Sequence, residues 1–121
     1  MVGEIDPETL RDRLAAESER PLLVDIRGAE AFAEGHLPGS LNVPMADLPR
    51  EIDRIADAEH VVTICPHGKA SVKAARIIAA YRDFDGRVDS LAGGLEAWDG
   101  ELERDDAESA EAAAADEDAP F

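Results

Sequence analysis

Short apolar runs that alternate with helical segments constrain the fold of this chain more than any other feature of its sequence. Four runs have the length and pattern of strands, at residues 22–26, 41–43, 60–64 and 87–91. Helical spacing or capping marks residues 6–15, 29–34, 47–56 and 72–82 and a last turn at 95–98, with Asp6 as the first N-cap and Pro7 at the first helical position. Strands that alternate with helices favour a parallel sheet covered on both faces, so we expect an α/β domain.

The carboxyl-terminal segment differs sharply in composition from the rest of the chain. A length of 121 residues suits one compact domain. After Gly100, nine acidic residues accompany one basic residue, Arg104, so this segment carries −8 of the formal net charge of −16. Such a composition offers little that could form a core. We therefore expect a folded domain over residues 1–100 and a disordered acidic tail, without a chemical role, over residues 101–121.

The charge balance narrows the range of partners. The chain has 28 acidic and 12 basic residues. Nucleic acid is not expected as a partner, because binding it requires Lys and Arg to neutralise phosphates. High salt would screen the self-repulsion of so acidic a chain, and only two lysines occur beside ten arginines, which favours a halophilic source over simple solubility. No apolar run approaches the roughly 20 residues of a spanning helix and no signal peptide is evident, so we expect a cytoplasmic protein that does not contact the membrane.

A single cysteine, Cys65, stands directly after the run at 60–64. One cysteine cannot form an intramolecular disulfide or a multi-cysteine metal site, which leaves a buried spectator or a reactive thiol. Ligands of open parallel sheets bind beyond the carboxyl ends of the strands, where Cys65 is expected. The loop at 65–71 leads into a helix, and its amide groups can stabilise a thiolate. Such surroundings lower the pKa of a cysteine, yet position alone still leaves the buried spectator open, and it is the cluster of His67, Lys69 and Ser71 close to the thiol that favours the reactive form.

Several groups of residues occur in one order over about residues 5–100, and together they resemble the rhodanese domain family. They are VDIR at 24–27 with Glu30 and Phe32, GHLPGSLNVP at 35–44, CPHGKAS at 65–71 and LAGGLEAW at 91–98. The resemblance implies a three-layer α/β fold with a central, mainly parallel five-stranded sheet. It also implies that Cys65 is the nucleophile and carries sulfur as a persulfide, with no metal or organic cofactor. The substrate-binding residues that it implies around the sulfur are Pro66, His67, Gly68, Lys69, Ala70 and Ser71.

Two positions of this loop depart from the family pattern. Many members carry arginine at the second and last loop positions, where this sequence has Pro66 and Ala70. Lys69 can replace some of that charge, and its helical spacing with Lys73 and Arg76 predicts a basic stripe suited to an anionic donor. The alternative is an ordinary solvated helix face. Related phosphatases with this fold need a longer loop and an arginine six residues after the cysteine, so Ser71 argues against phosphate-ester hydrolysis.

The remaining shared residues are interpreted as structural. We expect an ion-pair and hydrogen-bond set that fixes the loop before Pro38 and Gly39, formed by Asp25, Arg27, Glu30 and His36. Trp98 is expected to anchor the last helical turn. His60, at the start of a strand, is expected to face solvent.

These expectations combine into one preferred function and two alternatives. The preferred function is transfer of sulfane sulfur from a small anionic donor such as thiosulfate to a thiol or cyanide acceptor, through a persulfide on Cys65. The first alternative is a non-enzymatic persulfide carrier or docking module that serves a sulfur-relay protein, and the loss of the loop arginines keeps it open. The second is an inactive interaction domain, which the intact Cys65 disfavours.

Overall fold

The computed structural model describes residues 2–16 and 20–104, and within them the chain forms one five-stranded sheet. The strands are β1 (Val2–Ile5), β2 (Leu22–Asp25), β3 (Leu41–Asn42), β4 (His60–Ile64) and β5 (Arg87–Leu91). Their order in the sheet is β1-β5-β4-β2-β3, and every pairing between them is parallel. Strand β4 is therefore central, and its carboxyl end lies between those of β5 and β2.

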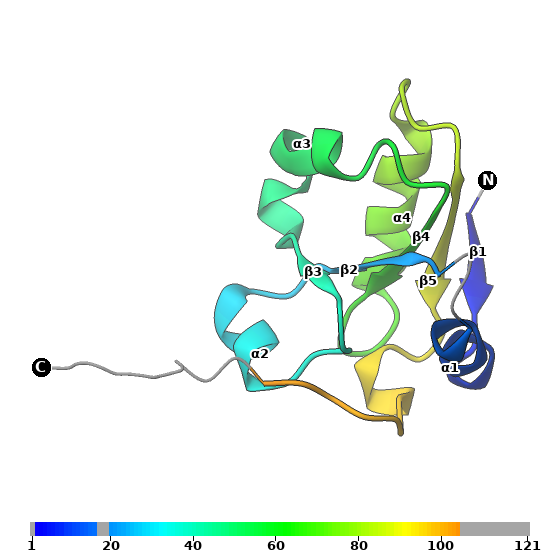
Figure 1. Ribbon diagram of the computed structural model, residues 1–121. Helices are drawn as coiled ribbons and strands as arrows, with labels where there is room; N and C mark the ends of the chain where they lie inside the picture. Colours follow the sequence, from blue (N-terminus) through cyan, green and yellow to red (C-terminus); the bar gives the residue numbers. More distant parts are fainter. Residues whose placement is uncertain (1, 17–19, 105–121) are drawn as a thin grey trace, which may run out of the picture.

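Helices cover both faces of this sheet. They are α1 (Pro7–Ala15), α2 (Ala29–Glu34), α3 (Leu48–Glu51) and α4 (Ala70–Ala80), with 3₁₀ turns at Met45–Asp47, Ile52–Arg54 and Leu95–Ala97. In Figure 1, α3 and α4 lie above the sheet and α1 lies below it. The observed architecture thus confirms the expected three-layer α/β fold with a parallel five-stranded sheet.

The sheet separates two apolar clusters, one on each face. The larger packs α4 and the segment from α3 onward against the sheet, with Ile55, Ile78 and Val61 all fully buried. The smaller packs Leu10 of α1 onto Val62, on the opposite face of β4. Strands buried on both faces read as continuous apolar runs, which is why β2 and β4 are recognisable in the sequence.

Local chemistry accounts for most element boundaries. Asp6 caps α1 as expected, because its Oδ1 accepts the amide hydrogen of Thr9 over 2.8 Å, and Pro7 opens the helix. The segment predicted as one helix at 47–56 is instead a 3₁₀ turn, the single turn α3 and a second 3₁₀ turn. Pro49, which has no amide hydrogen to donate, is tolerated only in the first turn of a helix, so α3 begins at Leu48 and the 3₁₀ turn before it stays separate.

Residues 101–104 are described and pack on the domain. The amide of His36 donates to the carbonyl of Glu103 over 2.9 Å, and the amide of Glu103 donates back over 2.8 Å. The indole Nε1 of Trp98 donates to the carbonyl of Glu101, and the side chain of Leu102 lies against Gly35. We refer to residues 101–104 as the strap. The ordered domain therefore extends past the expected boundary at residue 100, and residues 105–121 of the predicted tail lie outside the described residues.

Two truncated chains are expected to separate the strap from the segment after it. Ending the chain at Arg104 should leave the melting temperature unchanged. Ending it at Gly100 removes the paired amides of the strap and should cost about 1–2 kcal/mol of unfolding free energy, the scale of two net hydrogen bonds. The sulfur-transfer rate should stay within about twofold in both chains, as for residues outside the core and site. Thermal unfolding followed by circular dichroism tests this, and equal melting of the two chains would show that the strap does not stabilise the fold.

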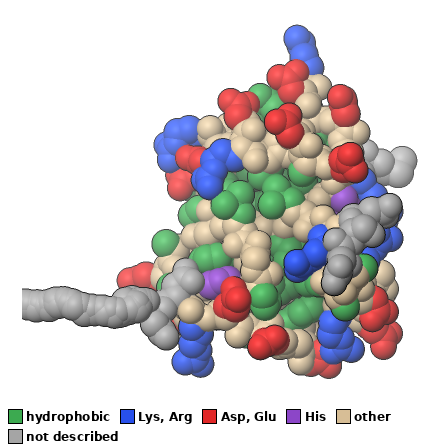
Figure 2. All heavy atoms as spheres, viewed as in Figure 1, with side chains coloured by type: hydrophobic (Ala, Val, Ile, Leu, Met, Phe, Trp, Pro, Cys, Tyr) green, Lys and Arg blue, Asp and Glu red, His purple; other side chains and the backbone are tan. Residues whose placement is uncertain are grey.

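The described surface mixes charges of both signs. In the view of Figure 2, acidic and basic side chains both occur around the rim, and hydrophobic side chains lie across the middle of the face. None of the helices in the described parts of the chain is long and apolar enough to cross a membrane.

Candidate active site

Cys65 lies at the carboxyl end of the central strand, immediately after β4. Its side chain is only 1% exposed and contacts the larger apolar cluster, so the sulfur forms the floor of the loop that follows. That loop runs from Pro66 to Lys69 and leads into α4, whose first residue is Ala70. The position of Cys65 at the carboxyl edge of a parallel sheet is the one expected from the sequence. Its deep burial, by itself, would also suit an unreactive cysteine of the core.

Hydrogen bonds around the sulfur distinguish it from a buried spectator. The amide of Gly68 donates to Sγ of Cys65 over 3.0 Å, and the hydroxyl Oγ of Ser71 lies 3.2 Å from Sγ. Burial raises the pKa of the Cys65 thiol, but the side chain of Ser71 and the amides of Ser71, Gly68 and His67 lower it by more in total. The pKa of Cys65 therefore lies below its ordinary value, and the thiolate forms at a lower pH than in a free cysteine.

The segment after β5, which begins with a glycine pair, holds the loop in place through main-chain contacts. The amide of Leu95 donates to the carbonyl of Cys65 over 2.8 Å, and that of Glu96 donates to the carbonyl of Pro66 over 3.0 Å. Gly94 has a positive φ of 67°, and a Cβ atom there would lie 2.4–2.6 Å from main-chain atoms of Cys65, His67 and Gly68. Only glycine allows this approach, so the LAGG segment is a structural support of the sulfur-bearing loop.

The side chains of the loop mostly face outward. Pro66, His67, Lys69 and Ala70 are exposed, and His67 Nδ1 lies 3.2 Å from Glu96 Oε1. Lys69 is the only cation of the loop, and it is not among the groups that lower the pKa of Cys65. Lys73 and Arg76 are also exposed, as the predicted basic stripe requires, and a solvated helix face has the same property.

Ser71 has a different place from the one expected. The family resemblance implies that Ser71 binds substrate from the loop, whereas the structure places it in the first turn of α4, where it is fully buried. Its hydroxyl contacts the sulfur from within the protein and also lies 2.6 Å from Oγ of Ser90 in β5. Ser90 was missed, because a serine in a strand-like run carries no signal of its neighbours across the sheet.

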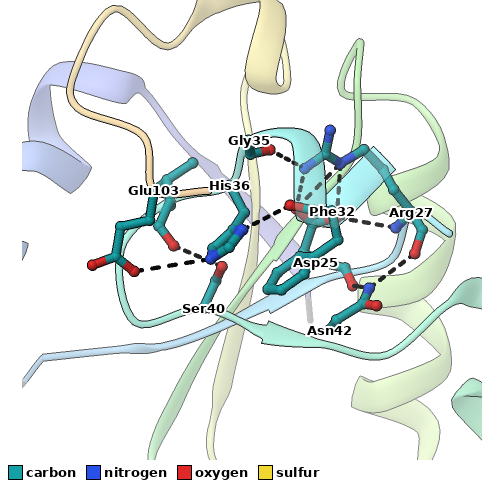
Figure 3. A network of polar contacts seen from close by, with 9 residues as sticks. Asp25, Arg27, Phe32, Gly35, His36, Ser40, Asn42 and Glu103 are labelled. Atoms are coloured by element: carbon teal, nitrogen blue, oxygen red, sulfur yellow. Dashed lines mark hydrogen bonds and ion pairs between the residues drawn. The ribbon is translucent and has the colours of Figure 1, made fainter. Parts of the chain in front are cut away.

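A second polar network occupies the carboxyl end of β2, next to β4 (Figure 3). The carboxylate of Asp25 is fully buried and accepts hydrogen bonds from Arg27, the shortest being 2.8 Å from Nη2 to Oδ2. Nη2 of Arg27 also donates to the carbonyl of Gly35 over 2.6 Å, and the side-chain Nδ2 of Asn42 donates to the backbone carbonyls of Asp25 and Arg27. Asp25 pairs in register with Ile64, the residue before Cys65, so the network fixes the sheet edge beside the sulfur.

Two members of the predicted set lie differently. Glu30 is exposed in the first turn of α2, and no hydrogen bond or ion pair joins it to this network within the described segments. Its negative charge there suits the amino end of a helix. His36 is buried, stacks on the ring of Phe32 at a centroid distance of 3.8 Å and donates from Nδ1 to the carbonyl of Phe32 over 2.7 Å. Its Nε2 lies 3.9 Å from Glu103 of the strap, so His36 links α2 to the strap.

The expectation that His60 faces solvent was wrong. Its Nε2 lies 2.8 Å from Oδ2 of Asp89, which also accepts from Nε of Arg87 over 2.9 Å. Asp89 sits within the sheet and is nearly fully buried, and its carboxylate needs such partners. Trp98 packs against the smaller apolar cluster, as expected of a residue that anchors the last turn.

No group of three or more His, Cys, Asp or Glu side chains that could hold a metal ion occurs among residues 2–16 and 20–104. The chemistry that the described residues can supply at this end of the sheet is that of a low-pKa thiol held under a loop of amide groups. The fold and site thus define a small parallel α/β domain with a thiolate-bearing loop.

Comparisons with known proteins agree with this description. The family described as "Rhodanese-like domain" matches residues 6–101. A protein named "Sulfurtransferase" from Allochromatium vinosum is 40% identical over 98 residues, which cover 81% of this chain and 89% of that protein. The "Thiosulfate sulfurtransferase GlpE" of Shewanella oneidensis is 34% identical over 82 residues, which cover 68% of this chain and 79% of that protein. A rhodanese-like domain protein from Staphylococcus aureus, known from a crystal structure, superposes with a TM-score of 0.74 at 28% identity over 84% of this chain and 97% of that one.

The chain therefore belongs to the rhodanese-like domain family. The family and the named relatives support sulfur transfer as its general activity and class it with the transferases.

Proposed function

We propose that this protein transfers sulfane sulfur from a small anionic donor such as thiosulfate to a thiol or cyanide acceptor, through a persulfide on Cys65. The observation that supports it most directly is the pair of contacts at the sulfur, from the amide of Gly68 and the hydroxyl of Ser71, which lower the pKa of the thiol. A thiolate is the form of cysteine that attacks sulfur.

Two displacements complete the proposed cycle. In the first, the thiolate of Cys65 attacks the outer sulfur of thiosulfate, a new S–S bond forms, and the bond to the sulfonate sulfur breaks with departure of sulfite and its electron pair. In the second, the acceptor attacks the outer sulfur of the persulfide and the thiolate of Cys65 leaves. With cyanide the product is thiocyanate. Amide groups of the loop at Gly68 and His67 are proposed to stabilise the negative outer sulfur between the two steps.

The persulfide can be observed directly. The purified protein is incubated with thiosulfate, freed of small molecules and weighed by intact-protein mass spectrometry. We expect a gain of one sulfur atom, and we expect cyanide to remove that mass with formation of one equivalent of thiocyanate. A protein that gains no sulfur from thiosulfate or from other sulfane donors would contradict the proposal.

A persulfide carrier that exchanges sulfur only with a sulfur-relay protein is the second candidate function. Pro66 and Ala70 stand where arginines would form an anion pocket, and a protein donor needs such a pocket less. A relative from Bacillus subtilis, 24% identical to this chain, is named "Putative sulfur carrier protein YrkF". Slow loading by thiosulfate together with fast loading by a persulfidated protein would favour this candidate. In either case we propose a cytoplasmic location, without nucleic acid or membrane as partner.

Replacing Lys69 with alanine is expected to weaken the use of an anionic donor. Its exposed ammonium is the only positive charge in the loop, so the rate with thiosulfate should fall about threefold to fivefold, the scale of one exposed charge interaction. The rate with a neutral organic trisulfide should not change. The pH at which the thiol half-ionises should also stay the same, because the pKa of Cys65 is set by burial, which raises it, and by Ser71 and loop amides, which lower it, and Lys69 is not among these groups.

Lys73→Ala is the matched control for this variant. Lys73 is also exposed but lies within α4, four residues further along the chain from Cys65, and its removal changes the net charge identically. Steady-state rates for the two variants with both donors give the comparison. Equal losses in both variants, or equal losses with both donors, would exclude a local anion site at Lys69.

A further inference from the structure

A chain of two buried hydroxyl groups lies behind the sulfur. Oγ of Ser71 lies 3.2 Å from Sγ of Cys65 and 2.6 Å from Oγ of Ser90. Both serines are fully buried, Ser71 in α4 and Ser90 in β5. The sulfur is therefore enclosed by the amide of Gly68 on the loop side and by this hydroxyl chain on the core side.

The proton count of a hydroxyl group makes the order of this chain matter. A serine hydroxyl has one hydrogen to donate and two lone pairs that accept. Ser71 can donate to a thiolate only if its hydrogen points at Sγ, and its contact with Ser90 must then be one in which Ser90 donates. The direction of the contact between Ser71 and Ser90 is therefore coupled to the direction of the contact between Ser71 and the sulfur.

We propose that Ser90 is a positioning residue for the reaction, which acts on Cys65 through Ser71. With Cys65 ionised, Ser90 donates to Ser71 and Ser71 donates to the thiolate. With Cys65 protonated, the thiol donates to Ser71, which turns and donates to Ser90. In both states of the sulfur the contacts from Cys65 through Ser71 to Ser90 then form one continuous chain, whose direction reverses without rearrangement of the backbone.

This arrangement favours the charged state in particular. A hydrogen bond to a charged acceptor is about twice as strong as one between neutral groups, and a hydroxyl that itself accepts a hydrogen bond donates more strongly. The same stabilisation applies twice in the proposed cycle, because the thiolate of Cys65 is the nucleophile of the first step and the leaving group of the second. The inference therefore deepens the proposed function and rests on it for its catalytic meaning.

A neighbouring hydroxyl shows what a merely structural role would look like. Oγ1 of Thr63 in β4 is also fully buried and donates to the carbonyl of Ser71 over 2.7 Å. It touches the main chain of Ser71 and not its hydroxyl, so it supports the position of α4 without entering the chain to the sulfur. Thr63→Val removes that hydroxyl with little change of shape and serves as the matched control.

The test is the pH dependence of alkylation by iodoacetamide, measured without any sulfur donor. The protein has one cysteine, so the rate reports Cys65 alone. In Ser90→Ala we expect the midpoint of the rate profile to move to higher pH, and the rate below that midpoint to fall about threefold to tenfold, the factor that one hydrogen bond provides. The rate at high pH, where the thiol is fully ionised in both proteins, should be unchanged. Thr63→Val should lower the melting temperature and leave the midpoint in place.

A second pair of variants separates the loss of the hydroxyl from the change of side-chain volume in Ser90→Ala. Ser90→Thr and Ser90→Val have nearly the same shape and differ in the hydroxyl, so the threonine variant should keep the wild-type midpoint and the valine variant should lose it. Superimposable profiles for wild type and the hydroxyl-free variants, or the same shift in Thr63→Val, would overturn the role of Ser90. Because alkylation needs no persulfide, a shifted midpoint in a protein that never accepts sulfur would leave this inference standing and reject the proposed function instead.

Discussion

Replacing Cys65 with serine is expected to abolish sulfur transfer. The chain has no other thiol, so no second residue can carry the sulfur. A serine hydroxyl is not ionised at neutral pH in this setting and forms no stable bond to sulfane sulfur, so neither displacement can begin. The rate with thiosulfate and cyanide should fall to that of buffer alone, and the variant should gain no mass on incubation with thiosulfate.

The same variant should fold normally, which makes the loss interpretable. Serine differs from cysteine by one atom and can still contact Ser71 and the amide of Gly68, so a similar melting temperature is expected. Comparison of the far-ultraviolet circular dichroism of the two proteins provides the control. Turnover that persists in Cys65→Ser at more than a trace of the wild-type rate would rule out the persulfide mechanism.

Replacing Gly94 with alanine is expected to be the most damaging change outside the sulfur itself. The added Cβ would meet main-chain atoms of the loop at 2.4–2.6 Å, closer than van der Waals contact allows, and the φ of 67° is one that side-chain-bearing residues rarely adopt. Because the colliding atoms belong to the backbone of Cys65, His67 and Gly68, relief requires the loop to move. We expect a loss of about 2–3 kcal/mol in stability and at least a tenfold lower transfer rate.

Gly39→Ala separates strain from collision. Gly39 has a φ of 79°, so alanine there carries a similar conformational cost, but no atom lies within 4 Å of its added Cβ. This control should lose only about 1 kcal/mol and keep its activity. Thermal melts and transfer rates of the two variants form the comparison. A Gly94→Ala protein that matches Gly39→Ala in both measurements would show that the loop does not depend on this close approach.

Much of the fold follows from the sequence because the inner strands β2 and β4 are largely apolar on both faces. The runs at β2, β4 and β5 could be predicted nearly to the residue, and the cap at Asp6 follows from one side chain and the proline after it. Strand β1 could not be read from its own residues, since it is short, contains Gly3 and buries only Ile5 fully. It forms by pairing with β5 at the edge of the sheet, which is a tertiary interaction. The expectation of a fifth strand therefore came from the family resemblance and not from the residues of β1.

The candidate site was predictable to the extent that it depends on strand ends. Cys65 follows a buried strand and begins a loop that leads into a helix, which predicts a thiol at the carboxyl edge of a parallel sheet. The structure places Cys65 directly after β4, at that edge. The contact between Ser71 and Ser90 behind the sulfur could not be predicted from the sequence. The two residues are far apart in the chain, and Ser90 comes close to Ser71 through the pairing of β5 with β4. The expected pairing of Glu30 with the Asp25 and Arg27 network was wrong. Glu30 is close to Arg27 in sequence, but α2 directs its side chain to solvent.

The main-chain attachment of the sulfur-bearing loop has an evolutionary consequence. Hydrogen bonds from backbone amides to backbone carbonyls fix the loop, and the side chains at 66, 67, 69 and 70 are exposed, with that of His67 near the exposed Glu96. These four positions can therefore mutate with little effect on folding, while each exchange alters the charge and shape that a donor meets. Selection, or a laboratory library limited to these codons, can change which sulfur compound is accepted while the scaffold that lowers the thiol pKa is inherited intact.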